Sequence, residues 1–267
     1  MLKTHHLEIF AVRHCNLSCY ACAQNSPLLA PRFSSLDVLE ASLNVLKKYL
    51  RPTKGVVLGG EPLLHPQIDD ILKLAKESNM FQKVCVTTNG LRLGAMTEQF
   101  WSNVDMVRVS VYPANHRHSE RSWPEWQRIA NFHRVELEER RMDSFQHIFT
   151  PIPHEDPTDA LRAFKACVYK DYCHTLSEGI LYRCSPVVFM DDVLAKLQIP
   201  ERVTEKSALP VVHSPEFEER LSTFLFGEQP IPGCQFCYGS NGQSFPHRQL
   251  TASERSQVKK CLWQPQS

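Results

Sequence analysis

Three cysteines with the spacing CxxxCxxC constrain this chain more than any other feature. Cys15, Cys19 and Cys22 follow a short apolar run, Leu7 to Val12, which predicts a β-strand. Three thiolates on one loop can hold three irons of a [4Fe–4S] cluster, and the fourth iron is then open to a substrate or cofactor. An electron-carrying site normally supplies four thiolates, so this spacing predicts a cluster that takes part in chemistry.

A second motif, Gly59-Gly60-Glu61-Pro62, follows another apolar run at Gly55 to Leu58. Glycines permit close backbone approach to a ligand, and the Glu61 carboxylate can accept a charge-assisted hydrogen bond from an ammonium group. Together the two motifs resemble those of the radical S-adenosylmethionine (SAM) enzymes. The resemblance implies that the three cysteines hold the SAM cluster and that Gly59, Gly60, Glu61 and Pro62 line the SAM site. The alternative, a zinc site, prefers paired C-x(2–4)-C knuckles.

Two further side chains match positions that contact SAM in this family, and a third lies one residue away from such a position. The aromatic residue that usually precedes the third cysteine is Ala21 here, and the aromatic, Tyr20, stands one residue earlier. Asn89 and Ser110, each near the end of an expected strand, match contacts to the SAM ribose or carboxylate. Turn formation is the alternative explanation of Asn89-Gly90.

Composition excludes several classes of protein. The chain has 267 residues and a net charge of +1, so no global field indicates a nucleic acid or membrane partner. No signal-peptide core or membrane-length apolar run is present, which favours a cytoplasmic location. Ten cysteines without an export signal indicate metal ligation and not disulfides.

Strand and helix patterns alternate through the first half, which predicts an α/β fold with parallel strands. The resemblance implies a partial (β/α)6 barrel. Pro151 to Pro157 is proline-rich and predicts a domain boundary, with a radical SAM barrel over 1–155 and a small cysteine-rich α+β domain over 156–267. The expected helices cover 35–50, 66–77 and 123–131, and the expected strands after the first cover 55–58, 83–87, 106–111, 133–137 and 145–149.

A second set of cysteines lies beyond residue 155. An expected hairpin at Glu178 to Cys184 and a later C-x-x-C resemble the twitch domain, a truncated relative of the SPASM domain. The resemblance, which covers essentially the whole chain, assigns four thiolates to an auxiliary [4Fe–4S] cluster: Cys167, Cys184, Cys234 and Cys237. A zinc knuckle at the C-x-x-C is the alternative.

Each of the other candidates keeps more than one explanation. Cys173 could replace Cys167, donate a hydrogen atom to a substrate radical, or serve as a small apolar residue. Cys261 is a ligand, a hydrogen donor or a bystander. Arg117 and Arg121 could bind an anionic substrate group such as a phosphate, or could belong to a solvated helix face.

The resemblance implies a radical SAM enzyme that uses SAM and two [4Fe–4S] clusters and needs a reductant such as flavodoxin or ferredoxin. The nearest functional analogue is a dehydrogenase that oxidises an aminocyclitol alcohol and passes an electron to its auxiliary cluster. We therefore expect oxidation of a small polar substrate: a sugar, cyclitol or nucleoside derivative. The alternatives are an epimerase, a peptide-modifying enzyme and an iron–sulfur electron carrier. The barrel begins near Leu7, so no leader-binding domain is expected, which favours a small substrate over a peptide.

Overall fold

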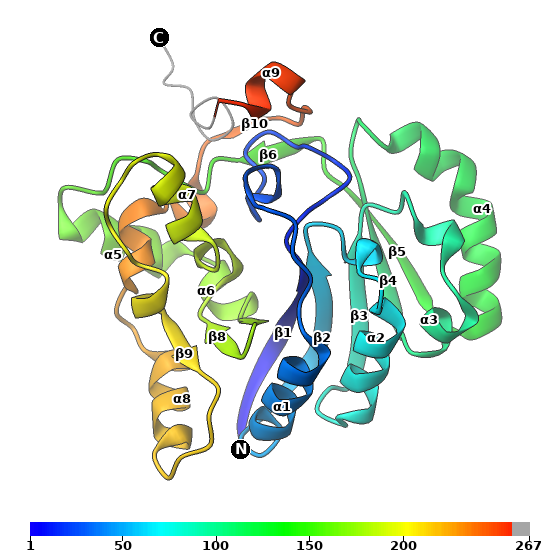
Figure 1. Ribbon diagram of the computed structural model, residues 1–267, viewed down its shortest axis with the longest axis horizontal. Helices are drawn as coiled ribbons and strands as arrows, with labels where there is room; N and C mark the ends of the chain where they lie inside the picture. The colour runs from blue at the N-terminus through cyan, green and yellow to red at the C-terminus, as the bar shows by residue number, and fades with distance from the viewer. Residues whose placement is uncertain (258–267) are drawn as a thin grey trace.

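An eight-stranded sheet organises the computed structural model, which describes residues 1–257 (Figure 1). The strand order is β5-β4-β3-β2-β1-β7-β8-β9. The first six strands in this order run parallel, and β8 and β9 are antiparallel to their neighbours. The strands are β1 (Leu2–Val12), β2 (Leu50–Gly59), β3 (Lys83–Thr88), β4 (Met106–Val111), β5 (Glu136–Arg141), β7 (Thr175–Ser177), β8 (Ile180–Tyr182) and β9 (Ala208–Pro210).

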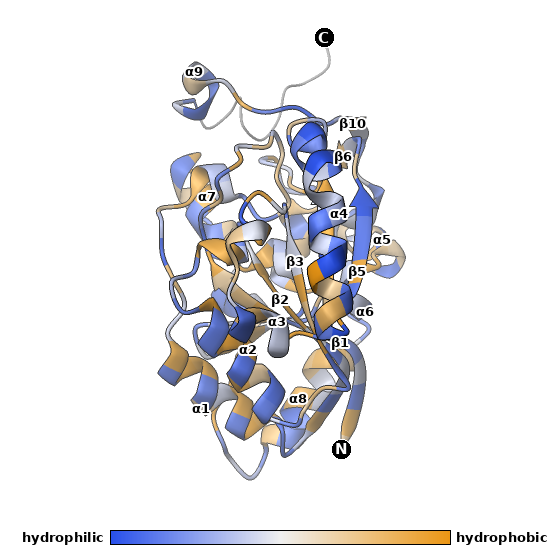
Figure 2. Ribbon diagram, turned by 90° about the vertical axis from the view of Figure 1, so that its right-hand side faces the viewer, coloured by the Kyte–Doolittle hydropathy of each residue, from blue (hydrophilic) through white to orange (hydrophobic). Residues whose placement is uncertain are grey.

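Helices cover both faces of the sheet because successive strand residues point to opposite sides. Ile9 packs with α1–α4 and α8, whereas Phe10 packs with α7. The outer face of α4 is mostly hydrophilic (Figure 2). The helices are α1 (Leu36–Leu46), α2 (Ile68–Glu77), α3 (Glu98–Ser102), α4 (His116–His133), α5 (Pro157–Ala166), α6 (Tyr169–Tyr172), α7 (Met190–Lys196), α8 (Phe217–Phe226) and α9 (Ala252–Arg255). In the described residues, no helix is both long and apolar enough to span a bilayer.

Two expected helices have different bounds in the structure. The first, expected to reach Leu50, ends at Leu46, because Leu50 pairs with Leu2 at the start of β2. Ser35 caps this helix, since its side chain accepts a hydrogen bond from the backbone N–H of Val38. The helix expected at 123–131 begins at His116 and continues to His133. The polar residues 116–121, which follow β4, therefore form the first turns of α4.

The prediction that residues 145–149 form the last strand of the barrel is wrong. This segment forms β6 (Ser144–Gln146), which pairs antiparallel with β10 (Ser244–Pro246) in a separate two-stranded sheet. The preceding strand, expected at 133–137, begins at Glu136 because α4 continues to His133. The sixth parallel strand is instead β7, which pairs with β1 on the side away from β2.

The predicted boundary at residue 155 falls between β6 and α5, where Asp156 caps α5. The sheet continues across it, because β7 pairs with β1. The mixed α/β fold with a parallel sheet is confirmed, while the division into two domains stays a prediction. The loop with Cys15, Cys19 and Cys22 follows β1, and the glycine motif follows β2. Both therefore lie at the carboxyl ends of parallel strands, where ligands bind in such folds.

Candidate functional site

Hydrogen-bond donors surround the thiols of the loop after β1. The backbone N–H of Leu17 donates to Cys15 Sγ at 3.3 Å, and Asn89 Nδ2 lies 3.6 Å from the same sulfur. Burial raises the pKa of Cys22, and the backbone N–H groups of residues 24–26 oppose that shift. Burial likewise raises the pKa of Cys15 to about 12. A bound cationic metal deprotonates such thiols, and the donors then stabilise the thiolates, so this loop fits an iron–sulfur cluster.

The third thiol, Cys19, receives its donors from the other end of the chain. Gln249 Nε2 donates to Cys19 Sγ at 3.1 Å, and His247 Nε2 lies 3.2 Å from it. The sequence carried no signal of this contact, because more than 220 residues separate the partners.

The described residues contain no group of three His, Cys, Asp or Glu side chains that could hold a single metal ion. A zinc site needs its ligands to converge on one ion. A cubane cluster instead gives each thiolate its own iron, so its thiolates need not converge on one point.

The glycine motif packs directly against the cysteine loop. The Gly60 N–H donates to Val12 O at 2.7 Å, and the Glu61 N–H donates to His14 O at 3.0 Å. A Cβ atom on Gly60 would stand 2.1 Å from His14 O. The close backbone approach expected from the glycines is therefore an approach between the two loops.

We expect Gly60→Ala to lower the free energy of unfolding by roughly 1–3 kcal/mol, the usual range for overpacking. The cause is the clash with the His14 carbonyl, which belongs to the backbone. Thermal or urea denaturation would measure the change. Gly94→Ala is the matched control, because its Cβ would meet only Trp126 Nε1, at 3.7 Å. Equal stability of the two variants would contradict the tight packing of the loops.

Glu61 is 1% exposed. It connects the carboxyl ends of β2 and β3. Its carboxylate accepts hydrogen bonds from the Thr88 hydroxyl at 2.6 Å, the Asn89 N–H at 2.7 Å and the Leu63 N–H at 3.0 Å. Burial raises its pKa, and these three donors oppose the shift. A carboxylate offers about four lone-pair sites, so one acceptor site remains for a ligand. Pro62 follows as the first residue of a 3-10 helix, Pro62–Leu64.

The other candidate SAM contacts are buried nearby. Asn89 lies between the two motifs, since Nδ2 also donates to Asn16 Oδ1 at 2.7 Å. Ser110 is buried, and its carbonyl accepts from Asn115 Nδ2 at 2.9 Å. Tyr20 is buried with its hydroxyl 3.3 Å from His147 Nε2. Their contacts to SAM stay predictions.

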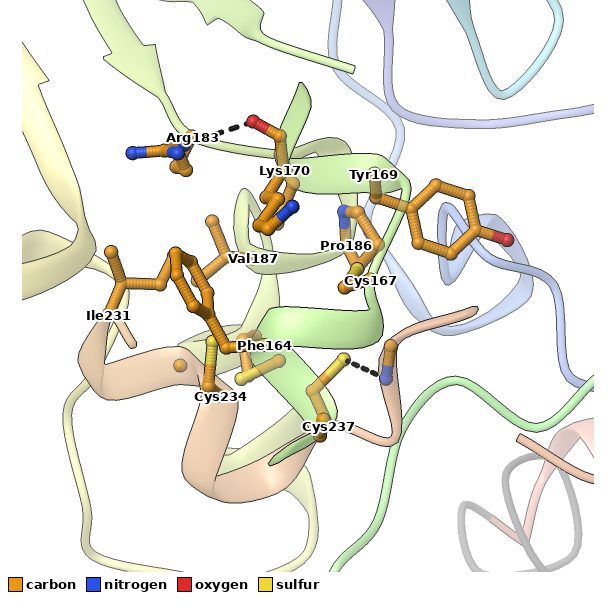
Figure 3. A pocket seen from close by; sticks show the side chains of 15 residues that line it. Phe164, Cys167, Tyr169, Lys170, Arg183, Pro186, Val187, Ile231, Cys234 and Cys237 are labelled. Atoms are coloured by element: carbon orange, nitrogen blue, oxygen red, sulfur yellow. Dashed lines mark hydrogen bonds between the residues drawn. The ribbon is translucent and has the colours of Figure 1, made fainter. Parts of the chain in front are cut away.

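The second cysteine set lines one pocket (Figure 3). Cys167 follows the last residue of α5, and Cys184 precedes a 3-10 helix at Ser185–Val187. Cys234 lies in a 3-10 helix at Pro232–Phe236, and Cys237 follows it. The Gly239 N–H donates to Cys237 Sγ at 3.2 Å. Burial raises the pKa of Cys234 to about 11 and that of Cys237 to about 12. The pocket thus collects four thiols: Cys167, Cys184, Cys234 and Cys237.

A buried cation also lines this pocket. Arg183 is 4% exposed, and its guanidinium donates to Lys170 O at 3.0 Å and Phe224 O at 2.6 Å. Burial lowers the pKa of Arg183, and the charges of Asp171 and of two pocket thiols oppose that shift. A buried charge is costly unless a partner compensates it. An anionic four-thiolate cluster would be such a partner, and sequence reasoning missed this residue.

Cys173 does not line the four-thiol pocket, whereas Cys167 does. The Cys173 thiol contacts the buried carboxyl of Glu8, whose pKa burial raises to about 7. Thr175 Oγ1 donates to Glu8 Oε2 at 2.8 Å. Cys173 is thus a partly buried thiol outside both cysteine sets. Cys261 lies outside the described residues.

The two candidate substrate arginines are on the first turns of α4. Arg117 lines a surface pocket with Tyr112, Arg141 and Asp143. Arg121 is exposed and does not line it. The structure therefore places one of the two beside a hollow at the end of β4.

Comparisons with known proteins identify relatives of this chain. The family model of the Radical SAM superfamily matches residues 9–148. The GTP 3',8-cyclase of Chlorobaculum tepidum is 38% identical over 112 residues, which are 40% of this chain and 32% of that protein. The GTP 3',8-cyclase of Shewanella denitrificans is 32% identical over 116 residues, or 41% of this chain and 32% of that protein. The matches thus span 32% of the length of these curated relatives.

Two solved structures share the fold along most of the chain. The structure of BtrN in complex with AdoMet and 2-DOIA has a TM-score of 0.51 and 13% identity, over 88% of this chain and 92% of BtrN. The structure of anSMEcpe with bound AdoMet has a TM-score of 0.53 and 13% identity, over 88% of this chain and 83% of anSMEcpe. At such low identity these likenesses show the fold alone.

Proposed function

The chain belongs to the radical SAM superfamily, and from this premise we propose that it oxidises a small polar substrate with SAM and two [4Fe–4S] clusters. One observation carries the proposal beyond the family: four thiols and a buried arginine line one pocket apart from the CxxxCxxC loop. A site of this composition suits an electron-accepting cluster, because four thiolates can occupy all four irons.

The residues of the first site bind and orient the cofactors. Cys15, Cys19 and Cys22 would hold the SAM cluster, which together with SAM supplies a 5′-deoxyadenosyl radical able to take a hydrogen atom from carbon. Glu61 orients SAM through its remaining acceptor site, and Asn89 holds the cysteine loop against the third strand. A one-electron reductant, such as flavodoxin or ferredoxin, is required to start each turnover.

The oxidation balances when one acceptor takes a single electron. A secondary alcohol carbon loses a hydrogen atom to the deoxyadenosyl radical, and the hydroxyl then loses a proton. One electron remains to be removed as the C=O bond forms. The auxiliary cluster would take this electron, and buried Arg183 favours its more negatively charged state.

The substrate class is a sugar, cyclitol or nucleoside derivative. The curated relatives are named for a nucleotide substrate, GTP. That name agrees with a small polar substrate. The hollow is lined by Arg117, Arg141 and Asp143, and Arg117 offers a guanidinium group for an anionic substituent.

An epimerase is the second candidate, because Cys173 is a partly buried thiol that lies outside both cysteine sets. Such a thiol could return a hydrogen atom to the opposite face of the substrate carbon. Peptide modification has no such observation in its favour. An electron carrier would have no use for a SAM site.

The direct test is anaerobic turnover of the reconstituted protein with SAM, dithionite and a panel of candidate substrates. Formation of 5′-deoxyadenosine, and of a product two hydrogens lighter than its substrate, would support the proposal. Intact SAM in every reaction would refute it.

We expect Glu61→Gln to weaken SAM binding roughly 10- to 150-fold, because a hydrogen bond to a charged group contributes about 1.5–3 kcal/mol. The amide loses the negative charge that attracts the SAM ammonium. Equilibrium dialysis with labelled SAM would measure the affinity. Iron content and melting temperature show whether the variant remains folded, since Glu61 also accepts three internal bonds.

The matched control is Glu125→Gln, on the exposed face of α4, which should leave SAM affinity unchanged. A folded Glu61→Gln protein with normal SAM affinity would mean that Glu61 only holds the strand ends together.

A further inference from the structure

The segment after β10 returns to the cysteine loop (Figure 1). The Tyr20 N–H donates to Arg248 O at 3.0 Å, and the Leu250 N–H donates to Ser18 O at 2.7 Å. Cys19 and Gln249 form an antiparallel bridge between these bonds. Residues 247–250 therefore act as a short strap, paired along the loop that carries the first cysteine set.

The orientation of the Gln249 amide is fixed by its own partner. The Ser18 N–H can only donate, and it lies 2.6 Å from Gln249 Oε1. The amide nitrogen must then face the other way, where it donates to Cys19 Sγ at 3.1 Å. This side chain thus presents an N–H group to the sulfur through a bond that the backbone enforces.

His247 presents a second ring nitrogen to the same sulfur. Its Nε2 lies 3.2 Å from Cys19 Sγ, and its side chain is buried, with the residue 7% exposed. The ring stacks on Tyr112 at 4.8 Å with an interplanar angle of 14°, and Phe145 meets its edge at 4.8 Å. Packing therefore holds the imidazole in place. The Gln249 amide nitrogen lies 3.4 Å from the same ring nitrogen. In the Nε2–H tautomer His247 donates to Cys19.

We propose that Gln249 and His247 are positioning residues that set the reduction potential of the first cluster through Cys19. Hydrogen bonds to cluster sulfurs are one of the factors that set this potential. They stabilise the reduced cluster more than the oxidised one, because reduction adds negative charge to the thiolates. The strap would therefore make the cluster easier to reduce, which is the step that starts SAM cleavage. This inference rests on the assignment of Cys19 as a ligand.

The test uses Gln249→Met, which keeps the length of the side chain without the amide, and His247→Phe, which keeps the ring stack without the nitrogen. Each is followed by an EPR-monitored redox titration of the reconstituted protein. The signal of the first cluster is the one that changes on addition of SAM.

In each variant we expect the ratio of reduced to oxidised cluster at a fixed potential to fall about tenfold, a shift of about 59 mV for one electron. The double variant should shift further in the same direction.

Arg248→Ala is the matched control on the same strap. Its guanidinium stacks 4.3 Å from the Tyr20 ring centre, but its side chain gives no hydrogen bond to Cys19, so both donors remain. We expect its titration curve to match that of the unmodified protein. An equal shift in this control would overturn the proposal, because loosening of the strap would then be the cause.

Two further outcomes would also overturn the proposal. One is an unchanged potential in both variants with a full complement of iron. The other is loss of the first cluster from both variants with circular dichroism unchanged, which would make the strap a structural clamp only. Cys19→Ala separates this test from the assignment beneath it, because retention of the SAM-sensitive signal would remove Cys19 from the ligand set.

Discussion

Changing Cys15, Cys19 and Cys22 to Ala together is expected to remove about four of about eight irons per chain, the sum of two cubane clusters. SAM cleavage should fall to background. The loop would keep its backbone bonds to the glycine motif and the strap, so the fold should survive the loss. Iron and sulfide analysis after anaerobic reconstitution, with an assay for 5′-deoxyadenosine, would measure both effects.

Cys85→Ala is the matched control for this triple variant. Cys85 is equally a cysteine of the barrel region, but it is buried within β3 beside Met106 and should leave all irons in place. Zinc in place of iron after anaerobic isolation would contradict both cluster assignments. Eight irons in the triple variant would contradict the first assignment alone.

Local patterns in the sequence predicted the parts of the site that lie next to strands. The apolar run before Cys15 and the one before Gly59 are indeed the ends of β1 and β2. The hairpin expected at Glu178 to Cys184 is confirmed as β7 and β8. Its two turn residues, Glu178 and Gly179, have φ angles of 50° and 79°, as a type I′ turn requires.

Long-range pairing could not be predicted in the same way, because periodicity reports only local structure. Nothing in the sequence near residue 145 shows that this segment pairs with β10 in place of β5. The leucine periodicity of α1 continues to Leu50, but sheet pairing with Leu2 ends the helix earlier. The strap over Cys19 and Arg183 in the four-thiol pocket were missed for the same reason, since each meets its partners only after folding.

Changing Cys167, Cys184, Cys234 and Cys237 to Ala is expected to abolish oxidation while SAM cleavage continues. The variant should retain about four irons, those of the first cluster. Its substrate radical would have no acceptor for the last electron, so no product two hydrogens lighter should form. Cys173→Ala is the matched control, since this thiol lies outside the four-thiol pocket and its loss should change neither the iron content nor the oxidised product.

Turnover in deuterated water then decides between oxidation and epimerisation. A dehydrogenase should give an oxidised product with no deuterium on carbon, because the carbon loses hydrogen and gains none. An epimerase must instead return a hydrogen atom to the opposite face, and a thiol that exchanges with solvent would deliver deuterium. Cys173, which lies beside the Glu8 carboxyl, is the candidate for that role. We expect oxidation, because the four-thiol pocket and its buried arginine provide for the remaining electron. Deuterium at an inverted carbon, lost in Cys173→Ala, would instead establish the epimerase.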